Sequence, residues 1–157
     1  CHAYEITTSL GGETTKEILQ QHGYLYNYAS AQKACPAGWR LPTDEEWKQL
    51  EITLGMSVQA SNKSGWRGTY TGEILQQDES GSGIKLSADG FYSASHSTYT
   101  SKYRQLGCSG FFWTSTTDST KVNFAYYRKI AYNSTKCYRE STMKTNGLSV
   151  RCVRDAQ

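Results

Sequence analysis

The stretch Cys35-Pro-Ala-Gly-Trp-Arg-Leu-Pro-Thr-Asp-Glu-Glu-Trp47 decides the fold of this 157-residue chain. It reads as a turn that continues into a helix with a marked start. Thr43 and Glu46 have the spacing of a capping box, in which each side chain accepts a bond from the other residue's backbone N–H. Three apolar residues then fall on one helical face: Trp47, Leu50 and Leu54. Gly55 ends the pattern, so we expect a helix over residues 44–54.

A second stretch, Gly147-Leu-Ser-Val-Arg-Cys-Val153, lies near the other end of the chain and has the pattern of a terminal strand. The sequence also predicts a short helix over residues 28–34 and strands over residues 110–114 and 123–130. Residues 60–110 are rich in Ser, Gly, Thr and Tyr, which predicts long loops with short strands. Early helices followed by late antiparallel strands indicate an α+β domain.

The length fits one domain with a real core, and we place that domain at residues 23–157 after a polar lead-in at residues 1–22. The lead-in contains one candidate strand, Tyr4–Thr7. The formal net charge of +3 is spread without a run of like charge, so no nucleic-acid partner is expected. No apolar stretch approaches the roughly 20 residues of a membrane-spanning helix.

Cysteine usage favours an oxidising compartment over a metal site. None of the five cysteines forms a CxxC pair and the three histidines are scattered, so we expect no metal and no cofactor. The last four cysteines allow three connectivities, of which we favour Cys35–Cys152 and Cys108–Cys137. Cys1 has two interpretations: a free thiol at a chain end, or the lipidated first residue of a mature bacterial lipoprotein.

Several segments together resemble the Fibrobacter succinogenes major paralogous domain family of bacterial secreted domains and lipoproteins. The matching segments are residues 23–31, Cys35–Trp47, 110–117, 125–128, Tyr138–Arg139 and 146–155. The resemblance implies a C-type lectin-like fold, with two helices plus small antiparallel sheets and long loops. It also implies that Trp39, Trp47 and Trp113 are framework residues of the core. Cys108 and Cys137 stand outside the family pattern.

Neither calcium-dependent sugar binding nor catalysis is expected. Calcium-dependent lectins use Glu-Pro-Asn or Gln-Pro-Asp with Trp-Asn-Asp, and none of these triplets occurs here. The stretch Arg40–Trp47 also resembles formylglycine-generating enzymes, which work through a close pair of cysteines late in the chain. Cys137 and Cys152 are not such a pair, so this enzyme class stays a remote alternative. We interpret the acidic residues at 44–46 as helix-start residues whose negative charges interact favourably with the helix dipole.

The candidate binding region is Tyr126–Lys144, where tyrosine, asparagine and serine mix with cations. Tyrosine provides contact area at low entropic cost, and asparagine and serine provide adaptable hydrogen bonds. The predicted ligand-binding residues are Tyr126, Arg128, Tyr132, Asn133, Ser134, Lys136, Tyr138 and Arg139. Second-tier candidates are Tyr92, Tyr99 and Tyr103. The alternative interpretation is an ordinary polar hairpin, because tyrosine is also a good strand former.

The sequence therefore predicts a non-catalytic binding or adhesion module at a bacterial surface, secreted or anchored through Cys1 to the outer membrane. Its partner would be a host or bacterial protein, or a glycan bound without calcium. One alternative is a structural module of a surface lipoprotein or appendage. Another follows from a resemblance to the target proteins of diversity-generating retroelements, in which Tyr126–Lys144 would be the diversified segment.

Overall fold

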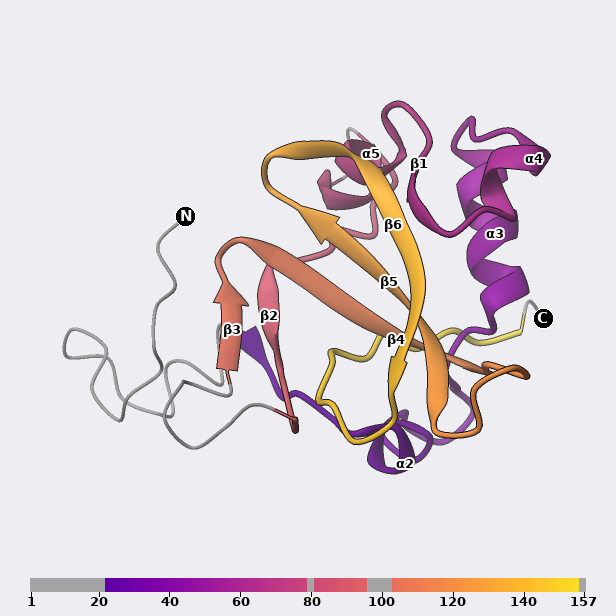
Figure 1. Ribbon diagram of the computed structural model, residues 1–157. Helices are drawn as coiled ribbons and strands as arrows, with labels where there is room; N and C mark the ends of the chain where they lie inside the picture. The colour runs from indigo at the N-terminus through magenta and orange to yellow at the C-terminus, as the bar shows by residue number, and fades with distance from the viewer. Residues whose placement is uncertain (1–21, 79–80, 96–102, 156–157) are drawn as a thin grey trace, which may run out of the picture.

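A computed structural model describes residues 22–78, 81–95 and 103–155 as a mixed α and β domain (Figure 1). Its helices are α2 (Tyr28–Ala31), α3 (Asp44–Thr53), α4 (Val58–Ser61) and α5 (Thr71–Gln76). Its strands are β1 (Gly65–Arg67), β2 (Asp89–Tyr92), β3 (Tyr103–Leu106), β4 (Ser109–Thr117), β5 (Phe124–Ala131) and β6 (Ser134–Met143).

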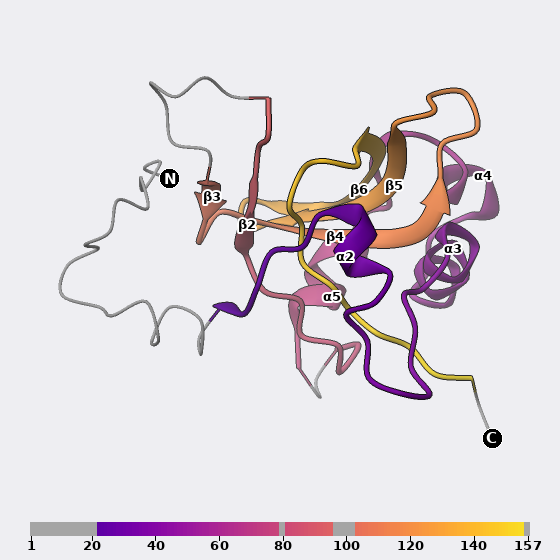
Figure 2. The same ribbon diagram turned by 90° about the horizontal axis from the view of Figure 1, so that it is seen from below.

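The strands form one sheet of six strands in the order β1-β6-β5-β4-β2-β3. The pairs are antiparallel except β2 with β4, which are parallel. Figures 1 and 2 show β2 and β3 at one end of the molecule and α3 and α4 at the other. The single large sheet and the four described helices correct the expectation of two helices with small sheets, because residues 58–76 supply two further helices and an edge strand.

The capping box of α3 is present as predicted. The Thr43 hydroxyl accepts a bond from the Glu46 N–H at 3.1 Å, and the Glu46 carboxylate accepts one from the Thr43 N–H at 2.7 Å. Gly55, with a φ of 97°, follows the helix in the left-handed conformation that glycine adopts without strain. Local sequence signals therefore placed this helix correctly.

The two ends of the described chain are joined beside the sheet. Cys35 and Cys152 form the predicted disulfide, with an S–S distance of 2.07 Å. Isolated bridges pair Tyr26 with Leu148 and Arg40 with Val153. The predicted terminal strand at residues 148–153 is wrong in this detail, because its residues pair in turn with three different segments and so form bridges instead of one ladder.

Strand alternation sends neighbouring residues of β4 into two separate cores. Phe112 packs on the helix-facing side, with Trp47, Leu75 and Ile130. The second core, on the opposite side, is formed by Ala31, Leu41, Phe111, Trp113, Ala125 and Leu148. Helix α5 approaches β6 closely, because a Cβ at Gly72 would lie 2.1 Å from the Lys136 carbonyl oxygen. The sheet thus has apolar packing on both of its sides, around β4.

Two of the three predicted framework tryptophans are buried. Trp47 and Trp113 are 3% and 0% exposed, as expected. The prediction for Trp39 is wrong, since it is 43% exposed in the turn before α3, where the guanidinium of Arg154 lies 5.3 Å from its ring. Trp66, whose burial was not predicted, is 41% exposed on edge strand β1.

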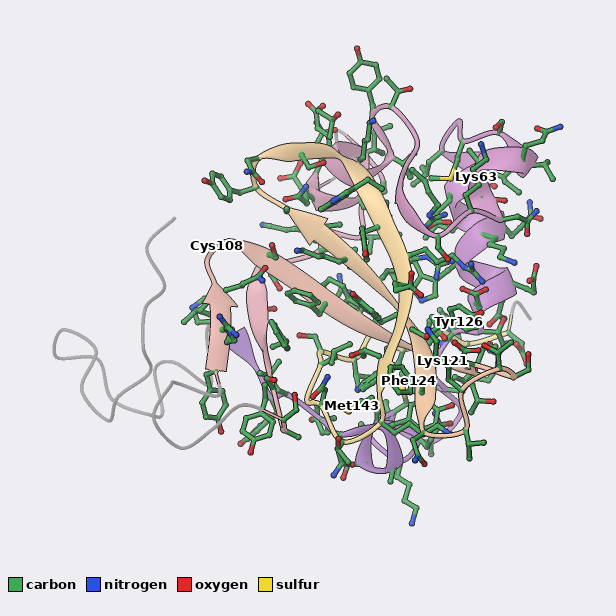
Figure 3. The ribbon with its side chains drawn as sticks, viewed as in Figure 1. Lys63, Cys108, Lys121, Phe124, Tyr126 and Met143 are labelled. Carbon is green, nitrogen blue, oxygen red and sulfur yellow. A yellow bond between two sulfur atoms is a disulfide. The ribbon has the colours of Figure 1, made fainter. Side chains whose placement is uncertain are left out.

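The predicted Cys108–Cys137 disulfide is wrong. Cys137 is a buried free thiol on the helix-facing side of β6, packed with Leu75 and Ile130. Cys108 lies between β3 and β4 (Figure 3) and forms a disulfide other than the predicted one. Sequence spacing could not show that β6 turns the Cys137 side chain into the core. Cys1, Tyr4–Thr7 and Tyr99 also lie outside the described residues.

Among the helices of the described ranges, none has the length and apolar character needed to cross a membrane.

Candidate binding face

The predicted ligand-binding residues do not share one surface. In β5 and β6, Tyr126, Arg128 and Arg139 face α3, whereas Tyr138 faces the opposite side of the sheet, as Lys136 does by strand alternation. Three others, Tyr132, Asn133 and Ser134, occupy the turn between the strands and the start of β6, and Tyr132 is 60% exposed. The predicted residues are therefore distributed over both faces of the sheet and the turn of the β5–β6 hairpin.

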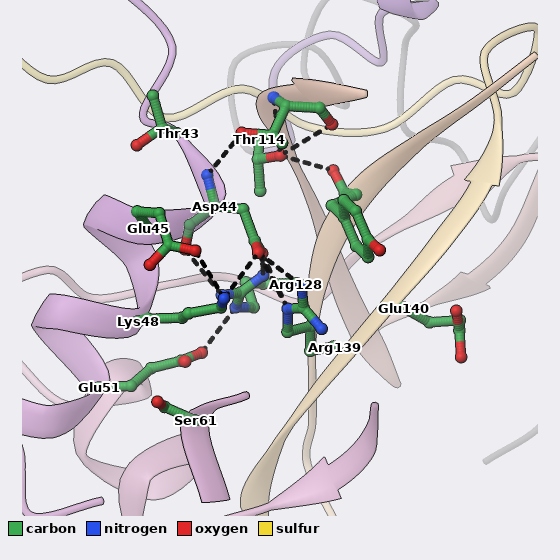
Figure 4. A network of polar contacts seen from close by, with 12 residues as sticks. Thr43, Asp44, Glu45, Lys48, Glu51, Ser61, Thr114, Arg128, Arg139 and Glu140 are labelled. Atoms are coloured by element: carbon green, nitrogen blue, oxygen red, sulfur yellow. Dashed lines mark hydrogen bonds and ion pairs between the residues drawn. The ribbon is translucent and has the colours of Figure 1, made fainter. Parts of the chain in front are cut away.

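Arg128 and Arg139 are buried in an ion-pair network beneath α3 (Figure 4). The Arg128 Nη1 atom lies 2.6 Å from Asp44 Oδ1, and its Nε atom lies 2.6 Å from Glu51 Oε1. Arg139 Nη2 lies 2.6 Å from Asp44 Oδ2. Arg67 completes the network with two bonds to Glu51, of 2.8 and 2.9 Å. Because Arg128 is 0% exposed, its prediction as a surface ligand residue is wrong, and Arg139 is likewise committed to the helix.

Tyr126 borders this network and is not an open recognition residue either. The Arg139 guanidinium carbon lies 4.3 Å from the centre of the Tyr126 ring, a cation–π contact. Figure 3 shows Tyr126 on β5, near Phe124 and at the end of the sheet where α3 lies. The Tyr126 ring is therefore occupied by its contact with Arg139, and a ligand would have to displace the guanidinium to stack on that face of the ring.

The network fixes the ionisation of Asp44. Burial by itself raises the pKa of Asp44, but the hydrogen bond from Arg139 and the charge of Arg128 outweigh burial and lower the pKa from 3.8 to about 2. For Glu51 burial acts in the same direction, and bonds from Arg67 with the charge of Arg128 again lower the pKa. Both carboxylates therefore remain charged inside the protein at neutral pH.

We expect the protein to lose stability as the pH falls from about 4 to about 2. A depressed native pKa stabilises the fold above the unfolded-state value of 3.8, and this contribution is lost as the pH falls through the native value of about 2. Asp44 alone would contribute about 2 kcal/mol. Urea unfolding at pH 7, 4, 3 and 2 measures the effect, with Asp44→Asn as the control that removes this part of the slope. An unfolding free energy that is constant from pH 5 to pH 2 would contradict the prediction.

The opposite side of the sheet carries a cross-strand line of rings, which we call the aromatic row: Phe91, Phe111, Lys129, Tyr138 and Trp66. Phe111 pairs directly with Lys129, Lys129 with Tyr138, and Tyr138 with Trp66, so one line crosses β4, β5, β6 and β1. Phe91 on β2 extends the line, its ring centre 4.6 Å from that of Phe111. The Trp66 and Tyr138 ring centres lie 5.1 Å apart, edge to face. Within the row Phe111 is buried, whereas Trp66 at its end is 41% exposed.

Tyr127 lies two residues before Lys129 on β5, so its ring is on the same side of the sheet and contacts the middle of the aromatic row. Its ring centre lies 5.9 Å from that of Phe111 and 6.2 Å from that of Tyr138. Burial, with smaller contributions from Tyr138 and Glu140, raises the pKa of Tyr127. Its phenol therefore stays protonated at every physiological pH and keeps an O–H donor at this face.

Lys129 is the one cation within the aromatic row. Its Nζ atom lies 5.1 Å from the centre of the Phe111 ring and 5.5 Å from that of Trp66. Within the described part of the chain it forms no ion pair, and partial burial lowers its pKa. The ammonium is thus held by rings alone, which is the arrangement of a cation–π contact.

Of the aromatic row and Tyr127, only Tyr138 was among the predicted binding residues; the others were missed, namely Trp66, Phe91, Phe111, Tyr127 and Lys129. Strand alternation could have indicated the two β5 residues, because positions 127 and 129 of the predicted strand must lie on one side of it. In the structure this is the side of Tyr138, which pairs with Lys129. No comparable signal marks Trp66, since its segment reads as a loop and its pairing with β6 spans about 70 residues.

The described residues offer little for metal binding or for thiol chemistry. No group of three or more His, Cys, Asp or Glu side chains there could hold a metal ion. Burial raises the pKa of the Cys137 thiol to about 12, so it is a protonated core residue. Two cavities of about 700 and 350 Å³ border residues 150–152, and no residue of the aromatic row lines either of them.

The fold and this face define a mixed α and β domain that is closed by a disulfide and presents aromatic side chains on one side of its sheet. The chain belongs to the Fibrobacter succinogenes major domain family, a bacterial family that it matches over residues 4–154. The match begins within the segment that we interpreted as a lead-in. Comparisons with curated proteins and with solved structures found no match.

Proposed function

We propose that this domain is a binding or adhesion module that recognises a glycan or a protein without calcium, at a bacterial surface or outside the cell. The observation that carries the proposal is the aromatic row, which ends in Trp66 at 41% exposure. Aromatic side chains of this kind are enriched where proteins recognise partners, because they combine a large apolar body with polar edges.

The framework supports this role by holding the face rigid. The buried ion pairs of Arg128 and Arg139 lie directly behind β5 and β6, and the Cys35–Cys152 disulfide closes the chain. A binding surface built on strands is positioned more precisely than one on loops, so less ordering is needed when a ligand binds. The meeting of the two ends of the described chain beside the sheet is in keeping with the C-type lectin-like fold, which we include in the proposal.

The proposal is non-catalytic and needs no cofactor. The formylglycine-generating alternative requires an accessible thiol, and Cys137 is buried while Cys152 is bonded to Cys35. A diversified Tyr126–Lys144 segment is less consistent with the fold, because Arg128 and Arg139 within it are framework residues.

Replacing Trp66 by alanine is expected to reduce ligand capture at least tenfold with little change in thermal stability, because about two fifths of this side chain is exposed. Capture is measured with the purified domain on glycan and surface-protein arrays, followed by titration of the strongest hit. The matched control is Trp39→Ala, which removes a tryptophan of 43% exposure that belongs to no strand of the sheet.

Equal loss of capture in the two variants would contradict the assignment of the site to the aromatic row. A large fall in melting temperature for Trp66→Ala would instead support the alternative of a structural module in which these aromatic rings only pack.

A further inference from the structure

We infer that the ligand of the aromatic row is an acidic glycan, with a sugar ring against Trp66 and a sugar carboxylate against Lys129. This inference rests on the proposed function and names the class of ligand. It follows from the position of Lys129, from the charges around it and from the size of the exposed area.

Lys129 occupies a position in the row where the neighbouring strands place rings. Phe111 and Tyr138 are its direct cross-strand partners, and Trp66 follows on the next strand. Its Nζ atom is 5.1 Å from one ring centre and 5.5 Å from another. A side chain of such length would ordinarily extend its ammonium into water. Here the ammonium lies over ring faces, which positions it beside the exposed tryptophan.

The Lys129 ammonium has no anionic partner among the described residues, although its partly buried position favours one. A partly buried charge is costly unless it is paired, and the rings compensate this cost only in part. The described residues give Lys129 no carboxylate. Glu140 is the nearest acidic residue by register, opposite Tyr127 on β6, and its carboxylate accepts a bond from the Ser141 N–H at 3.0 Å. A carboxylate from a ligand would therefore supply the missing charge.

Strand alternation places a second cation on the same side of β6. Lys136 is exposed and lies two residues before Tyr138. On β5 and β6 this face therefore carries the cations Lys129 and Lys136 and the anion Glu140, so its local charge also favours an anionic ligand.

The exposed area suits a few sugar units better than a protein. Phe111 is buried, and Tyr127, Lys129 and Tyr138 are only partly exposed, so Trp66 provides most of the open aromatic surface. A stable protein partner would need about 800 Å² on this side. A sugar ring presents C–H groups to an indole and hydroxyls to the polar edges, for which the phenols of Tyr127 and Tyr138 offer donors and acceptors.

The test compares polygalacturonate with its fully methyl-esterified form, which has the same backbone without the charge. Titration calorimetry is performed with the wild-type domain and with Lys129→Met, Lys129→Arg and Trp66→Ala, each checked by its melting temperature. We expect the wild type to bind polygalacturonate roughly 10- to 100-fold more tightly than the ester, the range for a charge-assisted contact. Lys129→Met should remove this preference, Lys129→Arg should retain most of it, and Trp66→Ala should weaken binding to both polymers.

The other outcomes separate this inference from the proposed function. If Trp66→Ala abolishes array capture while Lys129→Met leaves the preference for polygalacturonate unchanged, the binding face stands and the role of Lys129 is overturned. If poly-glutamate binds as tightly as polygalacturonate with the same dependence on Lys129, the ligand is an acidic peptide and the glycan assignment is wrong. Absence of binding to any of these polymers also overturns the inference, whereas only equal array capture by Trp66→Ala and Trp39→Ala overturns the site.

Discussion

Replacing Arg128 by alanine is expected to lower the free energy of unfolding by about 3–5 kcal/mol, the range for removing one partner of a buried ion pair. Arg128 is 0% exposed and contacts Asp44 and Glu51 at 2.6 Å each. Without it both carboxylates would remain buried, each with only part of its compensating charge. Urea unfolding at pH 7, followed by circular dichroism, measures the change.

The matched control for this prediction is Arg40→Ala. Arg40 also forms two ion pairs, with Glu46 and Asp155 at 2.6 and 2.7 Å, but all three side chains are exposed. Exposed pairs of this kind contribute little because water screens them. Similar losses in the two variants would show that the network beneath α3 is not the buried, mutually dependent cluster described here.

Removal of the Cys35–Cys152 disulfide is expected to cost about 4–5 kcal/mol in the chain-entropy model, because the bonded residues are 117 positions apart. The double variant Cys35→Ser/Cys152→Ser measures this loss in the same unfolding assay. The disulfide confines nearly the whole described chain, so its loss would mainly increase the entropy of the unfolded state.

The two single variants provide the control. Either substitution alone breaks the same bond, so Cys35→Ser, Cys152→Ser and the double variant should be destabilised by nearly equal amounts. If the losses of the two single variants instead add up in the double variant, the effect comes from the side chains and not from the bond.

Sequence reasoning succeeded where the determinants are local. The capping box at Thr43 and Glu46 and the stop at Gly55 fixed α3 almost to the residue. The Cys35–Cys152 bond was also predicted, from the expectation that an early helix is tied to the final segment. Trp47 and Trp113 entered the core as family framework residues, and the family assignment itself was confirmed.

The failures concern contacts between distant positions. Arg128 and Asp44 are 84 residues apart, and nothing local marks the arginine as a partner of a helix-start aspartate. An Asp-Glu-Glu run at a helix start was sufficiently explained by the helix dipole, so the second role of Asp44 stayed hidden. The predicted binding region is a continuous segment, but a strand directs alternate residues to opposite sides of the sheet. Tyr138 and Arg139 are neighbours in β6 and therefore lie on different faces.

The central claim, that ligands bind on the aromatic row, is tested most directly by the exposure of Trp66 itself. In a Trp39→Phe variant, Trp66 becomes the one exposed tryptophan of the protein, because Trp47 and Trp113 are buried. Acrylamide quenching of tryptophan fluorescence then reports on Trp66, with and without the strongest ligand from the arrays. We predict that saturating ligand abolishes most of this quenching. Saturation of the ligand site with unchanged quenching would contradict the claim and place the binding site elsewhere on the domain.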